Sequence, residues 1–212
     1  MPCRQRGLST AAHHSTCSSV VALSAALICS FTQALLRGMM SDKIPGSGYE
    51  EHTDAILRLL RGSPAGSFDS ALLAAGLNLL NQDALEVLTE CEARGVEVHT
   101  AAIFASGLLA GGVTYNYSAE RAGPYLEARD GWAKLAEEYG IALPAAVAVA
   151  FAALPVCVAK VVIGLNSTQE VDDAVGFAAA ASKVPAKLWH DAQERGLLAP
   201  AIPLPPAIAG IV

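Results

Sequence analysis

An alternation of strand-like and helix-like segments after residue 66 is the feature that most constrains the fold of this chain. Three short apolar runs, at residues 68–75, 96–103 and 156–165, have the length and composition of buried strands. Segments with apolar residues at helical spacing lie between and after these runs, and three of them end at a glycine or a proline. The predicted helices cover residues 81–94, 124–139, 145–154 and 168–181. Strands and helices that alternate with short connections are typical of a parallel sheet covered by helices, so the sequence predicts an α/β fold.

Composition narrows the class of protein further. The chain of 212 residues is 53% apolar and only 16% charged, which argues against disorder and against a coiled coil. Its net charge of −6 argues against nucleic-acid binding, because contact with a phosphate backbone needs clustered lysines and arginines. The five cysteines form no C-x-x-C pair, so the sequence predicts no zinc finger, no other metal site and no disulfide framework.

Charge is distributed unevenly along the chain. Residues 1–41 contain three arginines and no acidic residue, and they include the apolar run VVALSAALICSF. An acid-free, serine-rich start with arginines is typical of organelle transit peptides, and a run of this length also fits the apolar part of a signal peptide. A wrongly assigned start codon or exon explains the same composition equally well. We therefore separate residues 1–41 as a disordered or targeting-like leader, and expect a cytoplasmic protein unless this leader directs it to an organelle.

Two apolar stretches leave open a small membrane protein with spans near residues 20–36 and 141–165. The second stretch begins with 19 uncharged residues, and this length alone admits a membrane-spanning helix. Pro144 and Pro155, however, bracket an Ala/Val-rich segment that is typical of one buried helix. Lys160 would lie in the middle of such a span without a partner, which is costly in a bilayer. We therefore favour a buried helix followed by a strand, and expect no membrane association.

The order of these segments resembles the aldo/keto reductases. The resemblance is carried by FDSALLAAGLNLLNQDALEVL, CEARGVEVHTAAIFASGLLAGGVTYNYS, KVVIGLNSTQEVDDAVGF and VPAKLWHDAQERGLL, and it extends over residues 54–198. Within the family the chain is similar to the sugar dehydrogenases that act on L-fucose, D-arabinose, L-galactose or D-threo-aldoses. Family members are (β/α)8 TIM barrels, so the resemblance implies an incomplete barrel with about the last three βα units. Residues 42–198 would then form a partial aldo/keto reductase domain, and residues 199–212 a Pro-rich apolar tail.

The resemblance implies an NAD(P)-dependent oxidoreductase. The parent reaction of the sugar dehydrogenase branch is oxidation of an aldose C1 hydroxyl to the lactone by hydride transfer. The family's catalytic Asp, Tyr, Lys and His belong to strands that have no counterpart in this sequence, so we assign no catalytic residue. Because hydride transfer needs a group that handles the proton, we expect this chain alone to be inactive. The alternative is a catalytically inactive truncated paralogue, or a partner of a full-length enzyme.

The resemblance also implies that the cofactor-binding half is retained. Family members bind the cofactor pyrophosphate at the loop after strand seven and its adenosine end after strand eight. Backbone amides and a helix N-terminus suit anions at such places. The matching positions are Phe104 (backbone), Ser106, Gly107, Gly164, Leu165, Asn166 and Ser167.

Two acidic residues decide which cofactor we expect. Glu170 takes the position where NADP-dependent relatives place an arginine for the 2′-phosphate. A carboxylate there would repel a 2′-phosphate and accept a hydrogen bond from a free ribose 2′-hydroxyl, which favours NAD over NADP. Asp173 takes the position of an acid that meets the adenine amino group. The alternative is that both carboxylates only complement the helix dipole and face water.

The expected partners are a nicotinamide cofactor and, in a complete enzyme, a small sugar. A partial barrel also exposes two sheet edges that lack neighbouring strands. Because such edges pair readily with other chains, the sequence predicts self-association through them.

Overall fold

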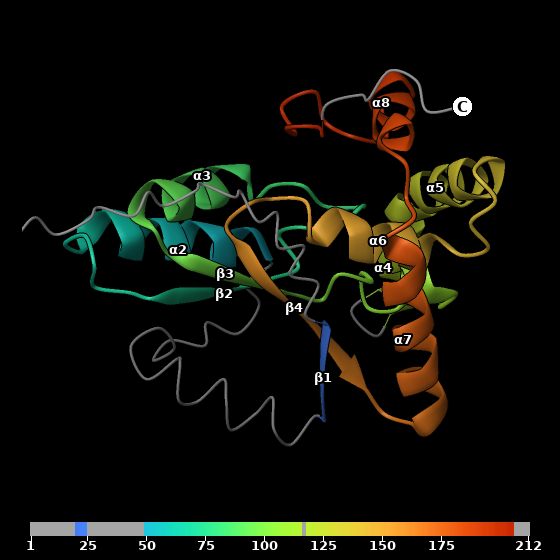
Figure 1. The fold of residues 1–212 in the computed structure, drawn as a ribbon, viewed down its shortest axis with the longest axis horizontal. Coiled ribbons are helices and arrows are strands. Elements are labelled where there is room, and N and C mark those ends of the chain that lie inside the picture. Colours follow the sequence, from blue (N-terminus) through green and yellow to red (C-terminus); the bar gives the residue numbers. More distant parts are fainter. Residues whose placement is uncertain (1–19, 25–48, 116–117, 206–212) are drawn as a thin grey trace, which may run out of the picture.

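The computed structural model describes residues 20–24, 49–115 and 118–205, and Figure 1 shows the arrangement of their helices and strands. The strands are β1 (Val20–Ser24), β2 (Ser70–Ala74), β3 (Glu97–Ala101) and β4 (Val158–Leu165). The α-helices are α2 (Tyr49–Gly62), α3 (Leu85–Arg94), α4 (Ala119–Ala122), α5 (Leu126–Glu138), α6 (Pro144–Ala152), α7 (Thr168–Ala181) and α8 (Ala186–Glu194). Two 3₁₀ turns, η1 (Leu108–Ala110) and η2 (Gly123–Tyr125), complete the described elements.

The described strands form one parallel sheet in the order β1-β4-β3-β2. Helix α2 contacts β2, α3 contacts β3, and both α6 and α7 contact β4. The neighbours β2, β3 and β4 therefore follow one another in the chain and are connected through helices, which is the arrangement of a (β/α)8 barrel over part of its circumference. The predicted α/β fold class is confirmed.

The two faces of the sheet differ in burial. Leu73 and Thr100, which are in register on neighbouring strands, are buried on one face, and Leu73 belongs to the core that α2, α3 and α6 supply. Leu72, His99 and Lys160 form an in-register row on the opposite face. Inward-facing and outward-facing side chains alternate along the strands of a barrel, so this second row lies on the face that a closed barrel turns inward. The Lys160 side chain is exposed on this face.

The structure confirms the predicted order of helices and strands after residue 66 and corrects some of their ends. Helix α7 begins and ends at the predicted residues. Helix α3 begins at Leu85 and not at residue 81, because two asparagines hold the preceding residues in turns. Asn78 Oδ1 accepts hydrogen bonds from the backbone amides of Leu80 and Asn81, at 2.9 Å each. Asn81 Oδ1 in turn accepts one from the Asp83 amide at 2.9 Å.

Strand β1 lies within the segment that the sequence predicts to be a leader. It pairs in parallel with β4, from Val20 opposite Val161 to Ser24 opposite Leu165. The sequence did not predict this strand, because its run of apolar residues is also typical of a targeting segment. The rest of residues 1–41, and residues 206–212 of the predicted tail, lie outside the described residues.

The membrane alternative is wrong for residues 141–165. These residues contain the nine-residue helix α6 and the eight-residue strand β4, which are separated by a turn. Of the other proposed span, residues 20–24 form β1, and residues 25–36 lie outside the described residues. Within the part of the chain that the structure describes, no helix is both long and apolar enough to cross a membrane.

Polar contacts hold α8 against the end of α5. The Tyr139 hydroxyl donates a hydrogen bond to Asp191 Oδ2 at 2.7 Å. Lys187 Nζ lies 2.7 and 2.8 Å from the two carboxylate oxygens of Asp191, and Arg195 forms an ion pair with Glu138. The Tyr139–Asp191 bond is half-buried, so we expect it to contribute more to stability than the exposed ion pairs beside it.

The Tyr139→Phe substitution tests this contact. We expect it to lower the free energy of unfolding by about 1–2 kcal/mol, because it removes the hydrogen bond to the Asp191 carboxylate and the longer one from Lys187 and keeps the ring. Urea denaturation followed by circular dichroism measures the change. Tyr125→Phe is the matched control, because the Tyr125 hydroxyl forms no hydrogen bond with any described residue. Equal stability losses in the two variants would contradict the assignment.

Candidate cofactor site

The carboxyl ends of β2, β3 and β4 lie at the same edge of the sheet, because the three strands are parallel. Barrels of this architecture build their sites from the segments that leave this edge. All nine residues predicted for the cofactor lie on the loop after β3, at the end of β4, in the short connection from β4 to α7, or in the first turns of α7. The structure therefore places the predicted positions on one side of the sheet.

The loop after β3 has a strained backbone. Ala102, Ala105 and Ser106 adopt left-handed conformations, with φ of +56°, +49° and +58°. Each non-glycine residue in this region costs about 1–3 kcal/mol, and such strain clusters at ligand-binding loops because the surroundings impose it. Gly107 and Gly111 follow with φ of +94°, which glycine adopts without a steric penalty.

Hydrogen bonds and buried leucines impose this conformation. The amides of Gly107 and Leu109 both donate to the Phe104 carbonyl, at 3.0 and 3.1 Å, and the Gly112 amide donates to the Gly107 carbonyl at 2.8 Å. Leu108 and Leu109 are buried and anchor the turn to the core. A Cβ added at Gly112 would lie 2.8 Å from the Gly107 carbonyl oxygen, so the loop closes on itself at a glycine.

The structure gives the three predicted residues of this loop different surroundings. The Phe104 ring packs edge-on against Phe177 of α7, with ring centroids 5.9 Å apart, so the loop and α7 are in contact. The Ser106 side chain is exposed. The Gly107 amide is already bonded to the Phe104 carbonyl, so in this conformation it is not available to a phosphate.

Residues 164–167 lead from β4 into α7. Gly164 is exposed, and a Cβ added there would meet no atom within 4 Å, so a ligand can approach this backbone closely. Leu165 packs in the same apolar cluster as Phe104 and Phe177. This cluster joins the loop after β3 to the start of α7, which brings the two predicted halves of the cofactor site together.

Glu170 forms a capping interaction at the start of α7. Ser167 Oγ accepts a hydrogen bond from the Glu170 amide at 3.2 Å, and Glu170 Oε2 accepts one from the Asn166 amide at 2.6 Å. The carboxylate therefore occupies an amide that the sequence analysis assigned to the adenosine phosphate. Serine followed by glutamate three residues later is the pattern of a capping box, a signal the sequence analysis missed. Asp173 is exposed, and its Oδ1 accepts a hydrogen bond from Gln169 Nε2 at 2.9 Å.

A Tyr–Lys–Asp cluster, which the sequence analysis also missed, lies between α5 and α8. Lys187 Nζ is 3.4 Å from the Tyr139 hydroxyl, which itself bonds to Asp191. Burial, and then the Asp191 carboxylate, raise the pKa of Tyr139 above its ordinary value. In Figure 1, α8 lies at the top of the molecule and α7 begins at the bottom. The cluster therefore joins two helices and does not belong to the candidate cofactor site.

Two further titratable groups of the described residues, His99 and Cys91, lie on the inner face of the sheet and in the core. Burial, and then the nearby Lys160 charge, lower the pKa of His99, and its Nε2 is buried without a hydrogen-bond partner among the described residues. Burial raises the pKa of the Cys91 thiol to about 11, so this thiol is protonated at neutral pH. Across residues 20–24, 49–115 and 118–205, no three His, Cys, Asp or Glu side chains are grouped so that they could hold a metal ion.

Comparison with known proteins identifies the family. A family model described as the Aldo/keto reductase family matches residues 53–188, which include β2, β3, β4 and all nine predicted cofactor residues. No match was found among curated proteins. Because the matched residues make up more than half of the 212-residue sequence, this chain belongs to the aldo/keto reductase family.

Proposed function

We propose that this chain binds a nicotinamide dinucleotide across the loop after β3 and the start of α7. Aldo/keto reductases are NAD(P)-dependent oxidoreductases. The observation that carries the proposal is the contact between Phe104 and Phe177, which holds the strained loop against α7 at the carboxyl edge of the sheet. An extended dinucleotide needs two such neighbouring segments, one for each end.

The pyrophosphate is assigned to the backbone around Ser106. Ala105, Ser106 and Gly107 have short side chains, so a phosphate can approach their backbone closely, and the exposed Ser106 hydroxyl can donate to a phosphate oxygen. The Gly107 amide can donate to the phosphate only when its hydrogen bond to the Phe104 carbonyl breaks.

The adenosine end is assigned to residues 164–167, Glu170 and Asp173. Residues 164–167 precede the 14-residue helix α7, whose N-terminus carries a partial positive charge that suits a phosphate. Glu170 would move from the Asn166 amide to the ribose 2′-hydroxyl of NAD when the phosphate takes its place. In NADP the 2′-phosphate would meet the Glu170 carboxylate directly, so the proposed cofactor is NAD.

The proposed parent reaction is oxidation of an aldose at C1 to the lactone. A bound nicotinamide would supply the acceptor for the C1 hydride, and a base would take the proton of the C1 hydroxyl. We assign the family's catalytic Asp, Tyr, Lys and His to no residue of this chain, and we propose that it binds the cofactor without turnover. Full-chain protein incubated with NAD and aldoses should accordingly form no NADH.

Titration with NADH and with NADPH, followed by nicotinamide fluorescence, tests the cofactor assignment. We expect saturable binding that is tighter for NADH. Glu170→Arg should reverse this preference, with a change in the NADPH-to-NADH affinity ratio on the order of tenfold, because a repelling charge becomes a charge-assisted donor.

Asp172→Arg is the matched control for this substitution. It makes the same charge change two residues along α7, at an exposed position that we do not assign to the cofactor. It should leave the preference for NADH in place. No saturable binding of either nucleotide to the folded chain would overturn the proposed function, and an unchanged preference in Glu170→Arg would overturn the role of Glu170.

A further inference from the structure

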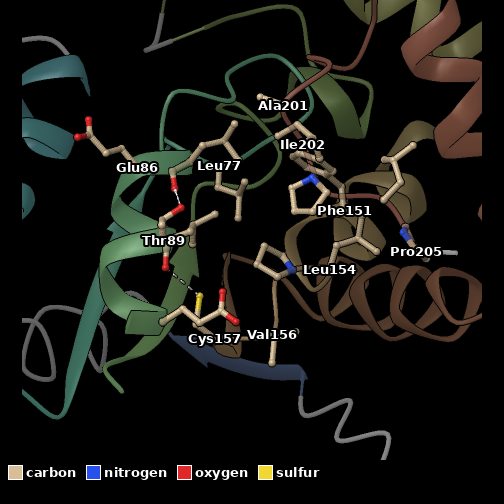
Figure 2. A pocket seen from close by; sticks show the side chains of 16 residues that line it. Leu77, Glu86, Thr89, Phe151, Leu154, Val156, Cys157, Ala201, Ile202 and Pro205 are labelled. Carbon is tan, nitrogen blue, oxygen red and sulfur yellow. Dashed lines mark hydrogen bonds between the residues drawn. The ribbon is translucent and has the colours of Figure 1, made fainter. Parts of the chain in front are cut away.

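A cavity of about 670 Å³ lies between α3, the end of α6 and residues 201–205, in the helical layer of the fold (Figure 2). Its lining is mainly apolar and includes Leu85, Leu154, Val156 and Leu204. None of the lining residues is among the nine residues assigned to the cofactor. This volume is in the range of sites that hold small organic molecules.

Two helical walls of this cavity are mainly apolar. Leu85, Leu88 and Glu92 recur at helical spacing on α3 and so line one side of the cavity. Phe151 and Leu154, at the end of α6, form the facing wall. Leu88 and Phe151 are already buried, whereas Leu85 and Leu154 keep accessible surface on the two walls. An aromatic or aliphatic group between Leu85 and Leu154 would remove this surface from water, which favours binding.

The third wall, residues 201–205, is fixed by side-chain amides. Gln82 Oε1 accepts a hydrogen bond from the Ala199 amide at 2.8 Å. Gln193 Nε2 donates to the carbonyls of Ala199 and Ile202, at 3.2 and 3.1 Å. Two prolines in this segment restrict its backbone further. The cavity is therefore preformed, which reduces the entropic cost of binding.

Apolar side chains remain exposed to solvent along the cavity. Val156 is 90% exposed, and Leu85, Leu154 and Leu204 are only half-buried. Exposed apolar surface of this kind marks binding sites when it gathers in a hollow. A bound apolar molecule would cover it.

The charge of the lining is entirely negative. Glu86 and Glu92 are its charged residues, and no lysine, arginine or histidine is among the lining residues that the structure describes. Glu86 is paired with Arg61, whereas the Glu92 carboxylate forms no ion pair or hydrogen bond with the described residues. Burial, and in addition the negative charge of Glu92, raise the pKa of the Cys157 thiol. The Glu92 charge is therefore felt at the end of the cavity that Cys157 lines.

We propose that this cavity binds a small hydrophobic amine, with its apolar body between Leu85, Leu154 and Leu204 and its ammonium group near Glu92. The apolar walls supply most of the affinity, and the carboxylate selects the charge of the ligand. An anion of the same shape would meet the unpaired Glu92 carboxylate and no cation among the lining residues that the structure describes. This site is independent of the proposed cofactor site and does not require NAD to bind.

Three naphthalene compounds of similar shape test the proposal: 1-naphthylmethylamine, 1-naphthylmethanol and 1-naphthoate. Equilibrium dialysis against the full chain should show the amine bound about 3- to 5-fold more tightly than the alcohol, which is the range of an exposed ion pair, and the carboxylate most weakly. Glu92→Gln should reduce amine affinity to that of the alcohol and leave alcohol binding unchanged. Glu97→Gln, an exposed control that does not line the cavity, should change neither.

A second variant tests the location without removing a charge. Ala201 is exposed and lines the cavity, so Ala201→Trp can fill the space without disturbing the core, and it should weaken all three compounds together. Excess NADH should displace none of them. Equal binding of amine and carboxylate, an unchanged amine-to-alcohol ratio in Glu92→Gln, or no saturable binding of the amine would each overturn the proposal.

Discussion

Replacing Trp132 by alanine is expected to lower the free energy of unfolding by about 3–5 kcal/mol, as large-to-small substitutions of buried aromatic residues do. Trp132 of α5 is fully buried, with 0% of its surface exposed. Its indole N–H donates a hydrogen bond to the Leu79 carbonyl at 3.0 Å, and its ring meets Trp189 of α8 edge-on with centroids 6.5 Å apart. Alanine would leave a cavity where α5, α8 and the segment after β2 meet, and would leave the Leu79 carbonyl without its donor.

Urea denaturation followed by circular dichroism measures this loss without relying on the fluorescence of the substituted residue. Since single domains are stable by about 5–15 kcal/mol, Trp132→Ala should retain only part of its folded population at moderate urea. Trp132→Phe keeps a ring and removes the N–H, so its loss should be smaller. Lys134→Ala, at an exposed position of the same helix, should change stability by less than about 0.5 kcal/mol. A loss below 1 kcal/mol in Trp132→Ala would contradict the assigned core.

This part of the core could be predicted from the sequence. Trp132 and Leu135 lie three residues apart in a predicted helix, so the pattern alone turns them toward the same side. Trp189 lies in a second segment of the same kind. That the two tryptophans meet each other is a tertiary contact, and helical spacing cannot predict which helices become neighbours.

The ends of some elements could not be predicted, because they depend on local side-chain hydrogen bonds or on strand pairing. Helix α7 has the predicted bounds because its cap, Ser167, directly precedes an uninterrupted helical run. The start of α3 differs because the side chains of Asn78 and Asn81 bond to nearby amides, and such local competition with the helix depends on side-chain geometry. Strand β1 is defined by its pairing with β4, and a short apolar run gives no indication of its partner.

The candidate cofactor site could also be predicted only in part from the sequence. The family resemblance predicts which positions lie at the carboxyl edge, and the structure places them there. The family resemblance does not predict the hydrogen bonds that these residues form with each other. Glu170 caps α7 through the Asn166 amide, and the Gly107 amide donates to the Phe104 carbonyl. Left-handed conformations at Ala105 and Ser106 could not be predicted either, because alanine and serine rarely adopt them.

Gly112→Ala is expected to weaken NADH binding by about tenfold or more, and this rests on the proposed function. The alanine Cβ would lie 2.8 Å from the Gly107 carbonyl oxygen and 3.0 Å from its carbonyl carbon. These are backbone atoms that cannot rotate aside, so the loop must open and lose the Gly112–Gly107 hydrogen bond. Gly123→Ala is the matched control, because a Cβ there would meet no atom within 4 Å.

Hydrogen exchange of residues 102–112 separates the loop's shape from its function. The Gly112→Ala loop should exchange faster than the parent loop even without a nucleotide, since the bond that closes it is lost. Faster exchange with unchanged NADH affinity would mean that the loop opens as expected but does not hold the pyrophosphate. Unchanged exchange would mean that the close approach at Gly112 does not control the loop. Hydrogen exchange therefore tests whether the contact at Gly112 holds the loop in its strained conformation. NADH affinity tests whether this conformation, which includes Ser106, is needed for cofactor binding.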